Sequence, residues 1–303
     1  MYPNLSLWRV ISNESSYGKI GFYEEGNKQI SIFYRFLATG TMEKNYARED
    51  EVLYHVGFAK KDLQGATLAV LPGDPGRVQP LAEALGADSR PLAEHREYTS
   101  FLTYIAERPV LVCSTGMGGP SVAICLEELA RMGITHVVRF GTTGTIQDKV
   151  DLGDVIINKA AVRLDGTSHH YAPAAFPAVA SFSMTEGLVR AAEKCDVPYH
   201  VGISVSSDTF WPGQERYDSF SGYVPRVFRG SMKEWQQLGA LNYEMETATL
   251  FVTAQALGLQ AAALCGVVAK RTDSERIAPN DIYQKAFAYQ IKTVKAFLAD
   301  SKL

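Results

Sequence analysis

An arginine follows an apolar run in the segment VVRFGTTG, residues 137–144. Burying a guanidinium group is unfavourable unless an anion compensates its charge. Arg139 therefore predicts an anion at a strand end, either a carboxylate of the protein or a ligand. Thr142 and Thr143 lie between two glycines and add hydroxyl groups and backbone N–H donors to this turn. The pattern favours an oxyanion site, and pairing with a carboxylate stays open.

Two further arginines stand beside turns. In LPGDPGR a glycine turn with Gly73 opens a helix that begins near Arg77, and such a turn suits an anion. EHREY places Arg96 just before a strand. Taken singly, these segments are also compatible with a surface arginine and a solvated run of charges, and neither matches a Walker A or G-x-G-x-x-G motif. Together with Arg139 they would form an oxyanion site.

The segment SSDTFWPGQERYD combines an aromatic ring with an amide and a guanidinium group. Phe210 can stack on a planar ring, Gln214 can both donate and accept, and Arg216 offers a fork of donors. These groups match the acceptor–donor–acceptor edge of a pyrimidine-2,4-dione. An ordinary turn before a helix is the alternative interpretation.

Two carboxylates flank a methionine in NYEMETATL. If the backbone is extended there, Glu244 and Glu246 point the same way and Met245 points the other way. A carboxylate can accept both hydroxyls of a ribose, and methionine can pack on the sugar face. If the segment is already helical, the acids instead complement the helix macrodipole.

These residues need a scaffold, and the chain predicts one of alternating strands and helices. We expect an α/β domain with a largely parallel central sheet and ligands near its strand ends. The expected strands are 67–71, 98–105, 108–114, 135–140, 154–163, 200–206 and 259–268, with 98–105 and 108–114 forming a hairpin, and the expected helices are 78–85, 118–133, 184–194, one from about 244, and 281–298.

Composition narrows the class of protein. Of 303 residues, 46% are hydrophobic and 21% charged, and the net charge of −3 does not suggest binding to nucleic acid or a membrane surface. The four cysteines form no C-x-x-C pair, and three lie in apolar runs, so we expect buried thiols and a cytoplasmic location. We divide the chain into a poorly ordered N-terminal extension, residues 1–48, and a domain of residues 49–303.

From about Val52 to the C-terminus, the sequence resembles the nucleoside phosphorylase family, in its bacterial hexameric type. The resemblance rests on the ordered set LPGDPGRV, HREY, STGMGGPS, RFGTTG, VRLDG, SSDTFWPGQERYD, NYEMETATL and GVVAKR. It implies a three-layer α/β/α fold with a mixed central sheet. It also implies reversible phosphorolysis of uridine to uracil and ribose 1-phosphate, with inorganic phosphate as co-substrate and no required cofactor. The family forms homohexamers, trimers of dimers, whose sites are shared between subunits.

The resemblance also implies roles for individual residues. The implied phosphate ligands are Gly73, Arg77, Arg139 and Thr142, with Arg96 from a neighbouring subunit. The implied ribose ligands are Thr142, Met245 and Glu246, with His55 from the neighbour. The implied base ligands are Thr143, Gly144, Phe210, Gln214, Arg216 and Arg271. Arg139, Glu246, Arg216 and Gln214 are the implied catalytic residues. Some members hold a monovalent cation such as potassium between subunits, at positions that correspond to Glu97, Met117 and Ser121.

Two positions depart from the family pattern. Lys270 stands where we expect a neutral residue, and Trp211 where we expect a smaller aromatic.

Three other functions are alternatives to this interpretation. A purine nucleoside phosphorylase is expected to carry an aspartate where this chain has Arg271. A hydrolytic nucleosidase has no use for an arginine-rich phosphate site, and a non-enzymatic descendant is expected to have lost ligands. The sequence does not distinguish uridine from deoxyuridine or thymidine.

Overall fold

The computed structural model describes residues 20–22, 30–32 and 44–300. The chain divides into two compact units, Met1–Asn45 and Tyr46–Leu303. In the first, β1 (Ile20–Phe22) pairs antiparallel with β2 (Ile30–Ile32). Most of the predicted extension, residues 1–48, lies outside the described residues.

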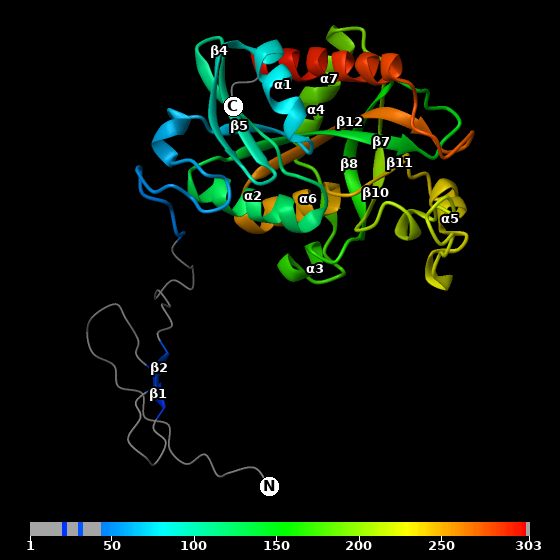
Figure 1. The fold of residues 1–303 in the computed structure, drawn as a ribbon, viewed down its shortest axis with the longest axis horizontal. Helices are drawn as coiled ribbons and strands as arrows, with labels where there is room; N and C mark the ends of the chain where they lie inside the picture. The colour runs from blue at the N-terminus through cyan, green and yellow to red at the C-terminus, as the bar shows by residue number, and fades with distance from the viewer. Residues whose placement is uncertain (1–19, 23–29, 33–43, 301–303) are drawn as a thin grey trace. The chain divides into compact units, whose positions relative to one another are not determined.

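A mixed ten-stranded sheet forms the framework of the second unit (Figure 1). Its strand order is β11-β10-β8-β12-β7-β3-β6-β5-β4, with β9 paired to β8 and β11 also paired to β7. The strands are β3 (Leu68–Pro72), β4 (Ala87–His95), β5 (Tyr98–Ile105), β6 (Arg108–Cys113), β7 (His136–Thr145), β8 (Val155–Leu164), β9 (Ala178–Val179), β10 (Tyr199–Ser207), β11 (Asn242–Glu244) and β12 (Gln260–Lys270). The central strands β6, β3, β7 and β12 are parallel, whereas β12 meets β8 antiparallel and β5 meets β6 antiparallel.

Helices cover both faces of this sheet, which confirms the predicted α/β/α fold (Figure 1). One face carries α1, α4 and α7, and the other carries α2 and α6. The helices are α1 (Val78–Leu85), α2 (Gly119–Arg131), α3 (Ser168–Tyr171), α4 (Phe182–Lys194), α5 (Ser231–Gln237), α6 (Thr247–Leu257) and α7 (Asn280–Asp300). Among the described residues, none of the helices combines the length and apolar character that crossing a bilayer requires.

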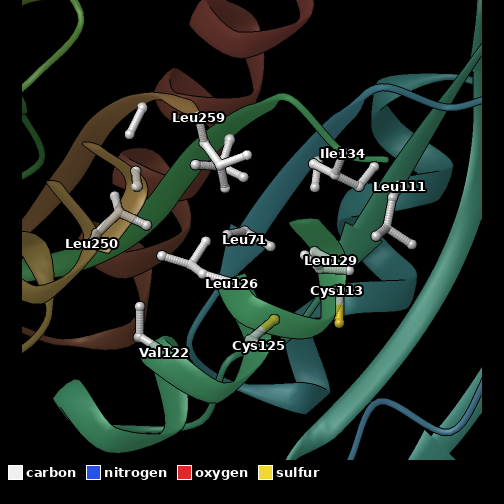
Figure 2. Close-up of a cluster of buried hydrophobic side chains, with 14 of the residues drawn as sticks. Leu71, Leu111, Cys113, Val122, Cys125, Leu126, Leu129, Ile134, Leu250 and Leu259 are labelled. Carbon is white, nitrogen blue, oxygen red and sulfur yellow. The ribbon is translucent and has the colours of Figure 1, made fainter. Parts of the chain in front are cut away.

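The buried strands divide their side chains between the two helical layers. Along β7, Val137 packs in the cluster that contains α2 and α6, whereas Val138 and Phe140 pack with α1, α4 and α7. Figure 2 shows the first cluster, where Leu126 and Leu129 of α2 lie among side chains of the sheet. Because side chains alternate along a strand, Arg139 shares the side of Val137. The alternation thus directs the guanidinium toward the layer that contains α6.

The hairpin of β5 and β6 and the two long C-terminal elements, β12 and α7, confirm the prediction from the sequence. The elements that the sequence analysis missed include β4 and α5, besides the short α3 and β9. The β4 strand is largely exposed or half-buried along its length, so it lacks the apolar alternation of a typical strand. The helix α5 has only seven residues and lies in a segment rich in turn residues. Three of the cysteines, Cys113, Cys125 and Cys265, are buried free thiols, as expected.

Candidate active site

The buried guanidinium of Arg139 forms ion pairs with two carboxylates. Its Nε lies 3.4 Å from Glu244 Oε2, and its Nη2 contacts Glu246 Oε2. All three side chains are at least nine-tenths buried. The carboxylate partner that the sequence left open is therefore present. Burial alone would lower the pKa of Arg139, but Glu246 and Glu244 outweigh it and raise the pKa, so the group stays charged.

The backbone explains why both acids reach Arg139. The segment is extended through Glu244, where β11 ends, and α6 begins only at Thr247. The predicted helix start near Glu244 is thus about one turn too early. Glu244 Oε2 accepts hydrogen bonds from the backbone N–H groups of Glu246 and Thr247, each at 2.8 Å. Glu244 caps the entry to α6 while its carboxylate contacts the arginine.

Glu246 is also held by the glycine turn before α2. Its Oε1 accepts a hydrogen bond of 2.7 Å from the backbone N–H of Gly118. Burial raises the pKa of the Glu246 carboxyl, and the charge of Arg139 opposes this shift. A carboxylate fixed by a guanidinium group and a backbone amide keeps lone pairs for a further donor, such as a ligand hydroxyl.

A second guanidinium group lies near Arg139 with donors to spare. The side chain of Arg77 is 12% exposed, and its Nε and Nη1 are buried without a hydrogen-bond partner. Burial lowers the pKa of Arg77, and the positive charge of Arg139 lowers it further. A Cβ at Gly73 would lie 3.8 Å from Arg77 Nη2, so the glycine turn borders this group. Arg139 Nε is likewise without a hydrogen-bond partner. Buried N–H groups of two arginines that make no hydrogen bond are suited to an anion.

Gly144 and Thr143 continue the same strand toward a second group of predicted residues. Gly144 packs against Arg271, because a Cβ there would lie 3.3 Å from Arg271 Cδ. The Thr143 hydroxyl donates to the Tyr243 carbonyl at 2.6 Å, and it accepts from Asn242 Nδ2 at 2.8 Å. This hydroxyl therefore joins β7 to β11. Thr142 and Met245 are half-buried.

The predicted base ligands gather around stacked arginines. The Arg216 guanidinium lies over the ring of Phe210, 4.3 Å from its centroid, and Arg271 lies over the ring of Tyr243, at 5.2 Å. Gln214, two residues before Arg216 in the sequence, is also buried. Burial lowers the pKa of Arg216, and the charge of Arg271 lowers it further. The two cations are therefore close enough to repel each other.

The sequence reasoning missed the acid that joins these two arginines. Glu275 Oε2 accepts from Arg216 Nη1 at 2.6 Å and from Arg271 Nε at 2.8 Å, and Glu275 Oε1 accepts from Arg271 Nη2 at 2.9 Å. Glu275 lies in the loop between β12 and α7. Arg271 and Glu275 are four residues apart, a spacing that brings two side chains together on a helix. In a loop the same spacing does not predict a contact, so the sequence alone did not reveal this ion pair.

The residues expected to serve a neighbouring subunit lie together at an exposed part of the chain. His55 Nδ1 lies 2.7 Å from Glu128 Oε1, and the His55 ring packs edge-on against Tyr54 with centroids 4.9 Å apart. Arg96 is exposed and donates to the Tyr54 hydroxyl at 3.0 Å. The structure thus brings His55 and Arg96 together through Tyr54, and among the described residues neither one has a hydrogen bond or ion pair with Arg139.

The three residues expected to hold a cation also lie close together. Ser121 Oγ donates to the carbonyl of Met117 at 3.1 Å. A Cβ at Gly116 would lie 2.9 Å from Glu97 Cγ, so Glu97 covers the turn that contains Met117. Carboxylate, hydroxyl and carbonyl oxygens are ligands that hard cations accept. No group of three or more His, Cys, Asp or Glu suited to a metal occurs in the part of the chain that the structure describes.

The two departures from the family pattern have structural partners. Lys270 Nζ contacts Asp151 Oδ1 and the Asp148 carbonyl, each at 2.9 Å, so its charge fixes the loop that precedes β8. Trp211 is half-exposed and packs edge-on against Phe210, with centroids 5.3 Å apart. Neither residue displaces a predicted ligand.

The sequence placed Arg139 at a strand end, but it lies within β7, which continues to Thr145. A mixed α/β sheet with guanidinium groups along β7 and just after β3 and β12 is typical of proteins that bind anionic or acceptor-rich small molecules beside the sheet. The sequence model of the phosphorylase superfamily matches residues 67–299, and the chain belongs to this superfamily.

The chain is similar to several curated members of that superfamily. It is 52% identical over 223 residues to uridine phosphorylase of Escherichia coli strain K12, which covers 74% of this chain and 88% of that protein. It is 48% identical over 252 residues to uridine phosphorylase of Haemophilus influenzae, covering 82% of this chain and 99% of the relative. Guanosine phosphorylase of Halorubrum lacusprofundi is more distant, with 37% identity over 200 residues, 66% of this chain and 77% of that protein.

Proposed function

We propose that this protein is a uridine phosphorylase, a pentosyltransferase that converts uridine and inorganic phosphate reversibly to uracil and ribose 1-phosphate. The similarity to curated uridine phosphorylases over most of the chain supports this function. The observation that carries it in the site is the buried Arg139, fixed by two carboxylates beside the unpaired donors of Arg77. A purely hydrolytic enzyme would have no use for that arrangement.

Phosphate is held by positive charge in this proposal. Arg77, Arg139 and the turn at Gly73 bind the dianion, and Thr142 and the neighbour's Arg96 complete its ligands. A phosphate oxygen attacks the anomeric carbon while the bond from that carbon to the base nitrogen breaks. The ribose becomes oxocarbenium-like, and the nearby dianion stabilises its positive charge. Glu246 accepts ribose hydroxyls, with Met245 against the sugar face and His55 from the neighbour.

The leaving uracil takes the bonding electrons, and its oxygens become more negative. Arg216 and Gln214 donate to these oxygens, and the hydrogen bonds strengthen as the charge grows. Phe210 stacks on the ring, and Arg271, Thr143 and Gly144 border it. No side chain has to act as a strong acid. A donor-rich pocket of this kind disfavours cytosine, because its exocyclic amine would face other donors.

The remaining expectations form part of the same proposal. The exposed Arg96 and the half-buried His55 have no hydrogen bond or ion pair with Arg139 within the described chain, which supports a homohexamer built from dimers that share sites. Glu97, Met117 and Ser121 supply suitable oxygens for a potassium ion. The free thiols support a cytoplasmic location.

The decisive experiment is uridine cleavage by the purified protein with and without inorganic phosphate, followed by absorbance and by product identification. Uracil and ribose 1-phosphate formed only with phosphate are the expected result. Cleavage without phosphate would contradict the proposal and indicate a hydrolase. Cleavage of inosine or guanosine in place of uridine would indicate a purine enzyme. A shortened chain that begins at Met42, assayed in parallel, tests whether the predicted extension matters for activity.

A further inference from the structure

The loop between β12 and α7 contains an acid that contacts both arginines of the proposed base pocket. Glu275 binds Arg271 through two hydrogen bonds, one to each of its carboxylate oxygens, and it binds Arg216 through Oε2. The Glu275 carbonyl accepts a further bond from Arg216 Nη1 at 3.0 Å. One residue thus supplies four hydrogen-bond contacts to two cations.

Both arginines are buried, and Glu275 is the carboxylate that compensates their charge. Their side chains are 3% and 0% exposed, whereas that of Glu275 is 31% exposed. Two buried guanidinium groups that lie close together repel each other unless an anion separates or bridges them. The lowering of the Arg216 pKa by the charge of Arg271 is consistent with this repulsion. Glu275 is the carboxylate that forms an ion pair with both.

The bridge also determines which donors remain for a ligand. Arg216 Nε and Arg271 Nη1 are buried and have no hydrogen-bond partner. Within the described part of the chain, the hydrogen bonds that these two guanidinium groups donate all go to Glu275. Fixing the occupied nitrogens fixes the direction of the free ones, because the guanidinium group is a planar, rigid fork.

We infer that Glu275 is a positioning residue for uracil recognition, which aligns Arg216 and Arg271 so that their free N–H groups meet the oxygens of the base. The inference rests on the proposed function and adds the residue that organises its base pocket. Glu275 does not touch the substrate in this role. It acts through the two arginines, and its negative charge compensates one of their two positive charges.

The test separates the two substrates kinetically. Glu275→Gln removes the charge but keeps the size, and Glu275→Asp keeps the charge on a shorter arm. We expect Glu275→Gln to raise KM for uridine about tenfold or more, with KM for phosphate changed less than about twofold, because uniform binding of only one substrate is lost. Glu275→Asp should recover part of the loss. Asp273→Asn, which neutralises an exposed acid in the same loop, is the matched control and should leave both constants unchanged.

Direct binding of uracil, measured by calorimetry on the full chain, checks the same point without turnover. Weaker uracil binding by a folded Glu275→Gln variant supports the inference. Unchanged uracil binding and an unchanged KM for uridine overturn it and leave the proposed function intact. An equal loss for uridine and phosphate also overturns it, because that result indicates a general structural role. If the wild-type protein fails to cleave uridine with phosphate, the proposed function fails first and this inference fails with it.

Discussion

At the scale of single residues, the site is a set of charges that stabilise one another. Arg139 contacts Glu244 and Glu246, and Glu275 contacts Arg216 and Arg271. In the first group one cation joins two anions, and in the second one anion joins two cations. Counted by formal charge, the first group has a negative excess and the second a positive one. The nearby Arg77 offsets the excess of the first group and brings it to formal neutrality, so that buried N–H donors, rather than a net charge, face the ligand there.

Replacing Arg139 should affect phosphate use more than uridine binding. Arg139→Lys keeps the charge for Glu244 and Glu246 but loses the planar fork. We expect kcat/KM for phosphate to fall about a hundredfold or more, because a preorganised donor to the reacting dianion is lost. Phosphate titrations at saturating uridine measure this. Arg190→Ala, which removes an exposed arginine paired with Glu186, is the control. Near wild-type use of phosphate by Arg139→Lys would refute the assignment.

The contact between Lys270 and Asp151 should make stability depend on pH. The hydrogen bond from Lys270 lowers the pKa of Asp151 below 3.8, and the same bond raises the pKa of Lys270 above 10.5. A carboxyl group whose pKa is lowered on folding stabilises the fold at pH values above its pKa in the unfolded chain. This stabilisation is lost as the pH falls through its pKa in the folded protein. A lysine whose pKa is raised on folding stabilises the fold at pH values below its pKa in the unfolded chain. This stabilisation is lost as the pH rises through its pKa in the folded protein.

We therefore expect Lys270→Asn to lower the free energy of unfolding between about pH 5 and 9. The difference from wild type should shrink at more acidic and more alkaline pH. Urea unfolding at several pH values measures it. Asp151→Asn should give the same loss, and the double variant should add little, because one interaction is removed in each case. A constant difference across the whole pH range would show that this ion pair is not its origin.

At the scale of elements, α7 packs closely on the sheet and supports the strands that carry the site. Gly266 of β12 faces this helix, and a Cβ there would lie 2.9 Å from Ala286 Cβ and 2.7 Å from Gln290 Oε1. Gln290 Nε2 donates to the carbonyl of Gly141 at 2.7 Å, two residues after Arg139. The helix therefore supports β7 and β12 directly behind the proposed phosphate pocket.

Gly266→Ala should separate α7 from the sheet. We expect a loss of about 1–3 kcal/mol in the free energy of unfolding, as for other overpacked cores. Denaturant titration measures the loss, and phosphate affinity should fall with it, because β12 lies beside β7 along most of its length. Gly76→Ala, in an exposed turn where the nearest atom would be 3.3 Å away, is a milder comparison. Equal stability of the two variants would count against tight packing at Gly266.

At the scale of the whole molecule, one strand connects the two ligand groups, and a third group forms contacts of its own. β7 contains Arg139 near its middle and Gly144 near its end, where the strand reaches Arg271. His55 and Arg96 lie together at the surface. An exposed arginine of this kind is what a site shared between two-fold related subunits would require.

Mixing two inactive variants tests that arrangement. Arg96→Ala and Arg139→Ala each remove a phosphate ligand from the same proposed site. If the ligands come from different subunits, a mixed dimer contains one site with both residues intact. Random mixing of equal amounts should then restore about a quarter of wild-type activity, from the statistics of a two-fold dimer. Co-expression with two affinity tags yields the mixed species. No recovery in a verified mixed dimer would place both residues in one subunit's site.

Much of this arrangement is predictable from the sequence, because local segments set it. Arg139 at the end of an apolar run indicates a buried cation, and the paired acids of NYEMETATL supply its partners once the backbone is extended. Glu275 could not be predicted, because its contacts depend on how the loop after β12 folds back toward Arg216, 59 residues earlier. The start of α6 was misplaced for a related reason. The Glu244 side chain accepts hydrogen bonds from the backbone N–H groups of Glu246 and Thr247. The sequence pattern does not reveal these bonds, and therefore does not reveal that α6 begins only after them.

The contact between Arg139 and Glu246 spans 107 residues of chain, and this separation constrains how the protein is made. On the ribosome, Arg139 emerges long before either of its carboxylates. During that interval β7 holds a guanidinium group that has no internal counter-ion, so burying the strand is unfavourable. We therefore expect the central strand to stay hydrated until β11 is synthesised. Synthesis of β11 and α6 thus allows both the core to close and the proposed active site to form.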